Sequence, residues 1–120
     1  MDGGTDFYTV TPCRLVDTRQ TGGALSPGTP RRIQAAGPCG IPATARALAV
    51  NATVIGPTGA GYLLLHRDGI QPPATSTLNF TAGATRANNA IVEIGQGGIL
   101  ARAALTGTVH VIVDVTGYFE

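Results

Sequence analysis

The segment TVHVIVDVTGYF, residues 108–119, alternates between two kinds of position with a period of two residues. Every odd position from 109 to 115 is a valine, whereas the even positions mix His110, Ile112 and Asp114. Successive side chains of a β-strand point to opposite faces, so one face of this segment is wholly apolar and the other is mixed. The pattern predicts a strand that packs one face into the core of a β-sandwich.

The same period of two recurs along most of the chain. In residues 46–55, Leu48 and Val50 have one parity and Asn51 has the other. Turn-forming Gly and Pro residues separate such segments. We therefore predict a single domain over residues 1–120, folded as an antiparallel β-sandwich of eight or nine strands, with a jelly-roll-like arrangement as the more specific alternative. The predicted strands are 6–17, 31–36, 46–56, 61–67, 76–81, 87–94, 98–105 and 107–119.

The composition excludes several classes of protein. Apolar residues make up 43% of the chain and charged residues 12%, a balance that argues against intrinsic disorder. The net charge of +1 gives no electrostatic reason to bind nucleic acid. No window approaches 18 consecutive apolar residues, so we expect no membrane insertion. The first residues lack a signal-peptide pattern, so the protein is expected either to be intracellular or to start after a removed signal.

Motifs for catalysis are missing from the sequence. His66 and His110 lie on separate predicted strands, and neither has the spacing of a metal site. No G-x-S-x-G elbow presents a serine nucleophile, and a phosphate loop is excluded because the chain has no lysine. His110 and Asp114 are about 13 Å apart along one strand, too far for a direct bond. We therefore expect no enzymatic activity, no metal and no cofactor.

Charged residues inside the predicted strands are the strongest candidates for a special role. Arg14, Asp17 and Arg19 cluster in the segment RLVDTR, while Arg86 and Asp114 lie in later strands. A half-buried carboxylate needs an Arg partner, backbone N–H groups or a bound cation. We expect a structural ion-pair network of these five residues. A calcium site and a ligand-binding site are the alternatives.

Two cysteines, Cys13 and Cys39, lie beside prolines near predicted turns. An even, minimal count is typical of one disulfide, and two buried free thiols are the alternative. Pro12 cannot donate a hydrogen bond to a central ladder, so we expect the first strand to be interrupted there.

Several of these segments resemble those of a small bacterial extracellular β-domain, found in secreted and cell-surface proteins. The segment PCRLVDTR, residues 12–19, is similar to its opening P-x-R-L-x-D-T-R motif. The segment HVIVDVTGYF, residues 110–119, is similar to its closing H-x-I-x-D-V-x-G-Y-F motif, and RANNAIV, residues 86–92, lies between them. The resemblance implies an extracellular or cell-surface accessory role with no catalytic residues to transfer. Some members carry the cysteine pair, which favours a Cys13–Cys39 disulfide.

Two functions remain after these exclusions. Apolar residues on both parities in segments 62–65 and 90–92 favour a structural module that forms a homo-oligomer, such as a trimer or a fibre. The alternative is a module that binds carbohydrate or cell-wall polysaccharide. Such modules need exposed aromatic rings, and Tyr8 and Tyr62 are the candidates for ligand contact.

Overall fold

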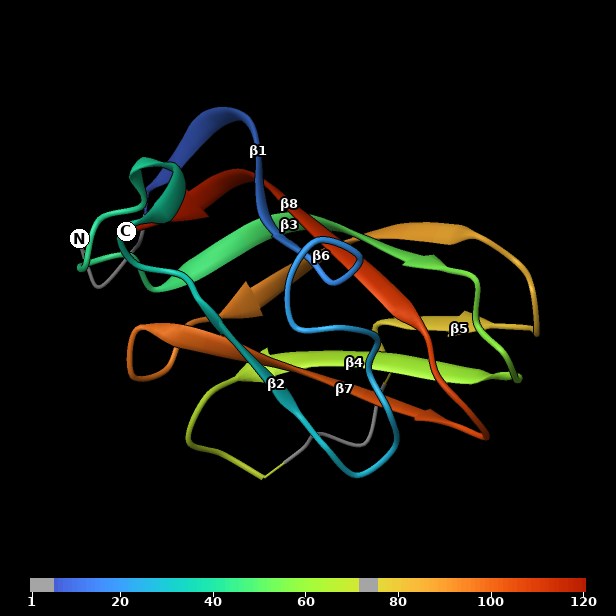
Figure 1. Cartoon of the computed structure of the whole chain (residues 1–120). Coiled ribbons are helices and arrows are strands. Elements are labelled where there is room, and N and C mark those ends of the chain that lie inside the picture. The colour runs from blue at the N-terminus through green and yellow to red at the C-terminus, as the bar shows by residue number, and fades with distance from the viewer. Residues whose placement is uncertain (1–5, 72–75) are drawn as a thin grey trace.

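The computed structural model describes residues 6–71 and 76–120 as strands joined by turns and one short 3₁₀ helix (Figure 1). Glycines and prolines occupy many of the turns, as the sequence pattern requires. The elements in chain order are β1 (Phe7–Asp17), β2 (Arg31–Gln34), η1 (Pro38–Gly40), β3 (Ala47–Ile55), β4 (Gly61–Arg67), β5 (Leu78–Phe80), β6 (Arg86–Glu93), β7 (Gly98–Leu105) and β8 (His110–Phe119).

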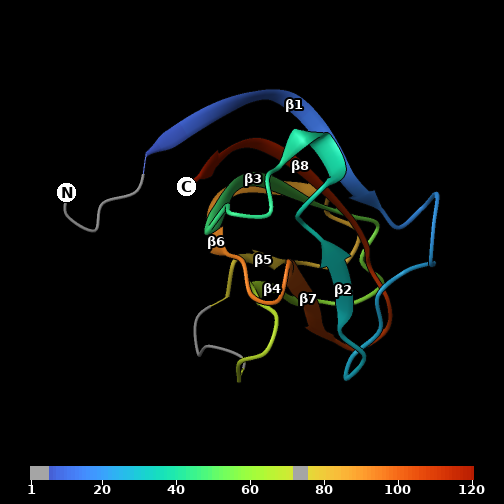
Figure 2. The ribbon, with the colours of Figure 1, turned by 90° about the vertical axis from the view of Figure 1, so that its left-hand side faces the viewer.

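The strands form two four-stranded antiparallel sheets that pack face to face (Figure 2). The first sheet has the order β1-β8-β3-β6 and the second has the order β2-β7-β4-β5. The strands therefore pair from the two ends of the chain inwards: β1 with β8, β2 with β7, β3 with β6 and β4 with β5. This nested pairing is that of one long hairpin folded over into two sheets. This is the strand order of an eight-stranded jelly roll. The predicted antiparallel β-sandwich is confirmed.

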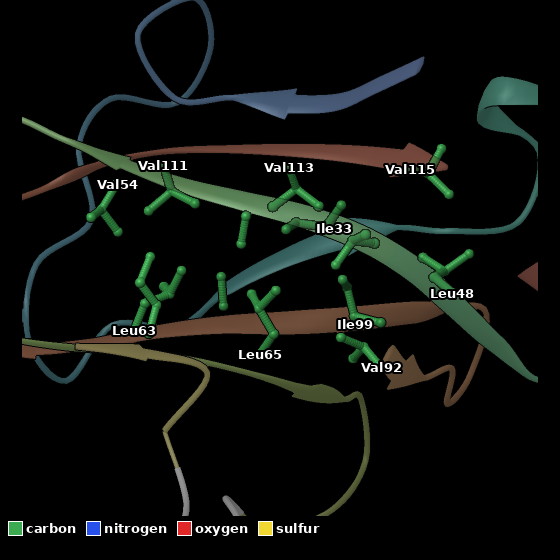
Figure 3. Packing of buried hydrophobic residues seen from close by; sticks show 14 of the residues in the cluster. Ile33, Leu48, Val54, Leu63, Leu65, Val92, Ile99, Val111, Val113 and Val115 are labelled. Carbon is green, nitrogen blue, oxygen red and sulfur yellow. The ribbon is translucent and has the colours of Figure 1, made fainter. Parts of the chain in front are cut away.

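The core lies between the two sheets and consists of the side chains with inward parity (Figure 3). Along β3, buried and half-buried residues alternate without a break. Val111, Val113 and Val115 of β8 are fully buried, as their period of two predicted. Leu63 and Ile99 project towards them from the second sheet and are equally inaccessible.

Some predicted strands are longer than the strands of the structure. The segment 76–81 yields only β5. Thr77 still donates its N–H to the carbonyl oxygen of Leu63 at 2.8 Å, but the N–H of Leu65 bonds its side-chain hydroxyl instead of its backbone, at 2.9 Å. The segment 107–119 yields β8 from His110, and Val109 forms an isolated bridge with Leu25 instead. The predicted interruption near Pro12 is a shift of register between Thr9 and Cys13 within a continuous strand.

Candidate functional site

Four polar side chains from four strands meet in one row on the outer face of the first sheet. The register places Arg14 of β1 opposite Asp114 of β8, Asp114 opposite Asn51 of β3, and Asn51 opposite Asn89 of β6. We call these four residues the polar row. The guanidinium of Arg14 donates from Nε to Asp114 Oδ1 at 3.0 Å. The opening motif, the closing motif and the segment with Asn89 are therefore adjacent in space.

A second row beside the polar row is apolar. Phe7 lies on β1, Gly117 on β8, Ala49 on β3 and Ile91 on β6, with Ala49 opposite both Gly117 and Ile91. We call these four residues the apolar strip. A Cβ atom at Gly117 would collide with the ring of Phe7 and the carbonyl oxygen of Tyr8, so glycine lets this ring lie against the sheet. Ile91 is 67% exposed and Phe7 is 49% exposed, although both are large apolar side chains.

Asp17 ends β1 and organises the turn that follows it. Its carboxylate accepts three hydrogen bonds from Arg19, one from the backbone N–H at 3.0 Å and two from the guanidinium at 3.0 and 2.9 Å. Arg14 lies 3.6 Å from the same carboxylate. The hydrogen bonds from Arg19 lower the pKa of Asp17 from its ordinary 3.8 to about 2. The carboxylate therefore fixes the turn as an anion.

Stability should fall in acid because of Asp17. Its pKa is about 2 in the folded chain and near its ordinary 3.8 in the unfolded chain, so the unfolded chain binds the proton first as the pH drops. The contribution of Asp17 is complete above about pH 5 and is lost as the pH falls towards 2. Thermal unfolding from pH 6 to pH 2.5 should show a smaller acid-induced drop in midpoint for Asp17→Asn than for the unaltered protein. Identical drops would contradict this assignment.

The remaining charged candidate, Arg86, lies apart from this network. It stands opposite Val54 and has the parity of the inward-facing residues of β6, whereas the polar row has the other parity. No ion pair among the described residues includes it. The sequence indicated that Arg86 lies on a strand. Which face of the sheet its side chain is on depends on the register of β6 with β3.

Thr18, between Asp17 and Arg19, joins the same turn to the last strand. Its hydroxyl oxygen accepts the N–H of Val111 at 2.9 Å and lies 2.9 Å from Nδ1 of His110. His110 is therefore held by a threonine rather than by a carboxylate. Within residues 6–71 and 76–120, no three His, Cys, Asp or Glu side chains are grouped closely enough to hold a metal ion.

A disulfide joins Cys13 of β1 to Cys39 of η1, as predicted, with their Cα atoms 5.8 Å apart. Cys13 lies opposite Val115, and both half-cystines pack against the core. The bond ties the loop between β2 and β3 to the first strand. Cys39 has a positive φ of 59°, so the tight turn around it uses a left-handed conformation.

The two candidate aromatic residues lie on different sheets. Tyr8 of β1 stacks on Tyr118 with ring centroids 5.2 Å apart and is 42% exposed. Tyr62 of β4 is 43% exposed and lies on the outer face of the second sheet, where Asn79 and Ala104 are its neighbours in register. The two rings therefore cannot form one platform.

Tyr62 lies at a groove that the sequence did not indicate. Leu64 and Arg102 stand opposite one another on its floor, and the segment 28–30 forms a wall. No sequence motif predicts this groove, because it forms only when the segment before β2 lies beside β7 in the folded chain. We call it the Arg102 groove.

A buried histidine holds Arg102 in this groove. His66 is 4% exposed, and its Nε2 accepts the Nε–H of Arg102 at 3.0 Å. Its Nδ1 carries the proton, because it donates to the carbonyl oxygen of Arg67 at 2.9 Å. This contact between His66 and Arg102 could not be predicted from the sequence. The only signal was a lone His and a lone Arg, each in an apolar strand.

Comparison with known proteins adds no further constraint on the site. In the part of the chain that the structure describes, no helix is both long and apolar enough to cross a membrane. No protein-family model matches the chain, and neither a curated protein nor a solved structure shows significant similarity to it.

Proposed function

We propose that this protein is a non-catalytic structural module that self-associates outside the cell, at a cell or particle surface. The observation that carries the proposal is the outer face of the first sheet, where the apolar strip runs beside the polar row. An antiparallel sheet normally turns a polar face to water. Here Ile91 and Phe7 remain exposed on a face that includes Ala49 and Gly117. Covering such a face removes apolar surface from water and favours association.

Four of the charged groups on this face form ion pairs and do not oppose contact with a second copy. Arg14 is paired with Asp114, and Asp17 is paired with Arg19, so positive and negative groups neutralise one another within the face. At these positions a second copy would meet ion pairs rather than isolated charges, whereas Glu93 of β6 is exposed on the same face without an ion pair among the described residues. Small residues beside them, such as Ala49 and Thr116, line only a shallow hollow. These features allow close approach of another flat surface.

Strand β6 offers a backbone edge next to the same face. Ile94 donates its N–H to the carbonyl oxygen of Arg46, so even-numbered residues along β6 bond to β3. Odd-numbered residues consequently direct their N–H and C=O groups away from the sheet. The side chain of Asn88 accepts the N–H of Asn89, but no described residue bonds the backbone of Ile91. An open strand edge of this kind can pair with a strand of another molecule.

Light scattering tests the proposal directly. The protein should have a mass above the 12.2 kDa of one chain, and the mass should decrease on dilution. Ile91→Lys should weaken association by about tenfold or more, because an exposed apolar anchor is replaced by a charge that must be desolvated. Tyr62→Lys on the other sheet is the matched control and should leave the mass unchanged. A mass of one chain at every concentration would refute self-association.

The disulfide supports the extracellular part of the proposal. Disulfides persist in oxidising compartments and are rare in the cytosol, and the Cys13–Cys39 bond closes a loop with a sequence separation of 26 residues. The similarity of the opening and closing motifs to an extracellular bacterial β-domain points the same way. Purified from its natural host without reductant, the protein should contain no reactive thiols in denaturant. Two reactive thiols would argue for an intracellular location.

Binding of carbohydrate or cell-wall polysaccharide is the second candidate function. The feature that favours it is the Arg102 groove, where an exposed aromatic ring lies beside a charged group that can bond sugar oxygens. The groove is on the second sheet, so ligand binding there and self-association through the first sheet are compatible.

A further inference from the structure

We propose that the Arg102 groove binds the carboxylate of an acidic sugar, such as a uronic acid within a surface polysaccharide. The inference rests on the second candidate function and names its ligand class. It is independent of self-association, because the groove and the apolar strip lie on opposite sheets.

Arg102 is oriented so that one side of its guanidinium remains available. Its Nε is bonded to His66, and this histidine is itself fixed by the carbonyl oxygen of Arg67. No described residue accepts a hydrogen bond from Nη1 or Nη2 of Arg102, and no described carboxylate forms an ion pair with it. The two Nη groups form a planar fork that matches the two oxygens of a carboxylate.

Because His66 is buried, its hydrogen bonds fix both its own protonation state and the position of Arg102. A histidine that is 4% exposed needs partners for both ring nitrogens, and it obtains the second from Arg102. With Nε2 acting as an acceptor, the histidine is neutral and leaves the positive charge of Arg102 uncompensated. A half-buried cation without a carboxylate partner is suited to an anionic ligand.

The groove also has a surface for the ring of a sugar. Tyr62 and Leu64 lie on the same face of β4, with neighbouring Cα atoms of one parity about 7 Å apart. Arg102 stands opposite Leu64, and Ala104 stands opposite Tyr62, so the small alanine leaves space beside the aromatic ring. In a uronic acid the carboxylate is attached directly to the ring. A carboxylate on Arg102 therefore places the sugar ring over Leu64 and next to Tyr62.

The wall of the groove supplies the remaining contacts. Thr29 carries a hydroxyl that can bond a sugar hydroxyl, and Pro30 offers a flat apolar surface. A phosphate is a poorer match, since the groove has one planar fork and the chain has a net charge of only +1. A peptide carboxylate shares the charge of a uronic acid but brings no sugar ring to Tyr62, so it serves as a comparison ligand.

NMR titration of the folded, disulfide-bonded protein tests this proposal with three probes: a galacturonic acid trisaccharide, the matched neutral galactose trisaccharide, and an acetylated tripeptide with a free C-terminus. The acidic trisaccharide should shift the resonances of Tyr62, Arg102 and the segment 28–30. Its affinity should exceed that of each other probe at least tenfold.

Variants assign the binding to this groove. Arg102→Gln should lower the affinity for the acidic trisaccharide at least tenfold. Arg102→Lys should recover only part of this affinity, because an ammonium cannot bind both carboxylate oxygens in one plane. Tyr62→Ala should weaken it about fivefold to tenfold. Arg86→Gln removes an equal charge from an exposed position on β6 of the first sheet and should leave the affinity unchanged. An unchanged thermal midpoint for each variant would show that the fold is intact.

Each other outcome overturns the proposal in a distinct way. Equal binding of the neutral trisaccharide would reject the acidic ligand class but retain the carbohydrate-binding function. Tighter binding of the tripeptide would assign the groove to peptide carboxylates. Loss of binding in Arg86→Gln as well as Arg102→Gln would mean that the ligand responds to the general charge of the protein rather than to this groove. No shift with any probe would reject both the ligand class and the carbohydrate-binding function.

Discussion

Replacing both Cys13 and Cys39 with Ser should lower the free energy of unfolding by about 3.5 kcal/mol. The chain-entropy estimate follows from a sequence separation of 26, which sets the size of the loop that the bond closes in the unfolded chain. A domain of this size is stable by only about 5–15 kcal/mol, so the loss is a large fraction of the total. The bond also holds η1 against β1, next to Ile41, the residue of the same loop that is buried in the core.

Urea denaturation with and without reductant measures this loss. The unaltered protein should be destabilised by reductant to the level of the double variant, and the double variant should not respond to reductant. The internal comparison separates loss of the bond from any effect of the serine side chains. A change below about 1 kcal/mol would mean that the unfolded chain gains little freedom when the bond is removed.

Leu63→Ala should cost about 2–5 kcal/mol, because it removes a fully buried side chain from between the two sheets. Leu63 faces the valines of β8 across the core, and the surrounding strands cannot collapse to fill the cavity (Figure 3). The matched change Leu64→Ala, one residue later on β4, should cost about 1–2 kcal/mol. Leu64 is also buried, but it lies on the floor of the Arg102 groove, where water can occupy the space left by truncation.

Chemical denaturation of both variants measures the difference. Equal losses would contradict the assignment of Leu63 to the enclosed core and Leu64 to the groove. The Leu64 variant also reports on the groove, since its floor would be deeper while Arg102 and Tyr62 remain in place. Any change in affinity for the acidic trisaccharide in this variant should therefore be smaller than the change caused by Arg102→Gln.

Strand content could be predicted well because alternation of apolar residues is a local property of the chain. Strands β4 and β7 have the predicted bounds, and the inward valines of β8 have the predicted parity. The ends of β5 and β8 could not be predicted in the same way. β5 begins after Thr77, whose hydroxyl bonds the N–H of Leu65, and β8 begins after Val109, which bridges Leu25. Both contacts depend on the placement of other segments of the chain.

For the candidate sites too, contacts between neighbours in sequence could be predicted and contacts between distant residues could not. Arg14, Asp17 and Arg19 could be grouped from the sequence because they are neighbours along the chain, and Asp17 indeed bonds Arg19 two residues away. Arg86 could not be excluded from their network, since its parity acquires a meaning only when β6 pairs with β3. The Arg102 groove could not be predicted from the sequence for a similar reason, because His66 and Arg102 are 36 positions apart along the chain.

Local pattern alone indicated an all-β chain with a period of two residues in most strands, and it identified Cys13 and Cys39 as the candidate disulfide pair. Only the tertiary structure decided the nested pairing of the strands, the polar row and the orientation of Arg102 by His66. The physical reason is the length scale of each interaction. Side-chain alternation depends on residues two positions apart, whereas the bond from Arg14 to Asp114 joins residues 100 positions apart and depends on the register of whole strands.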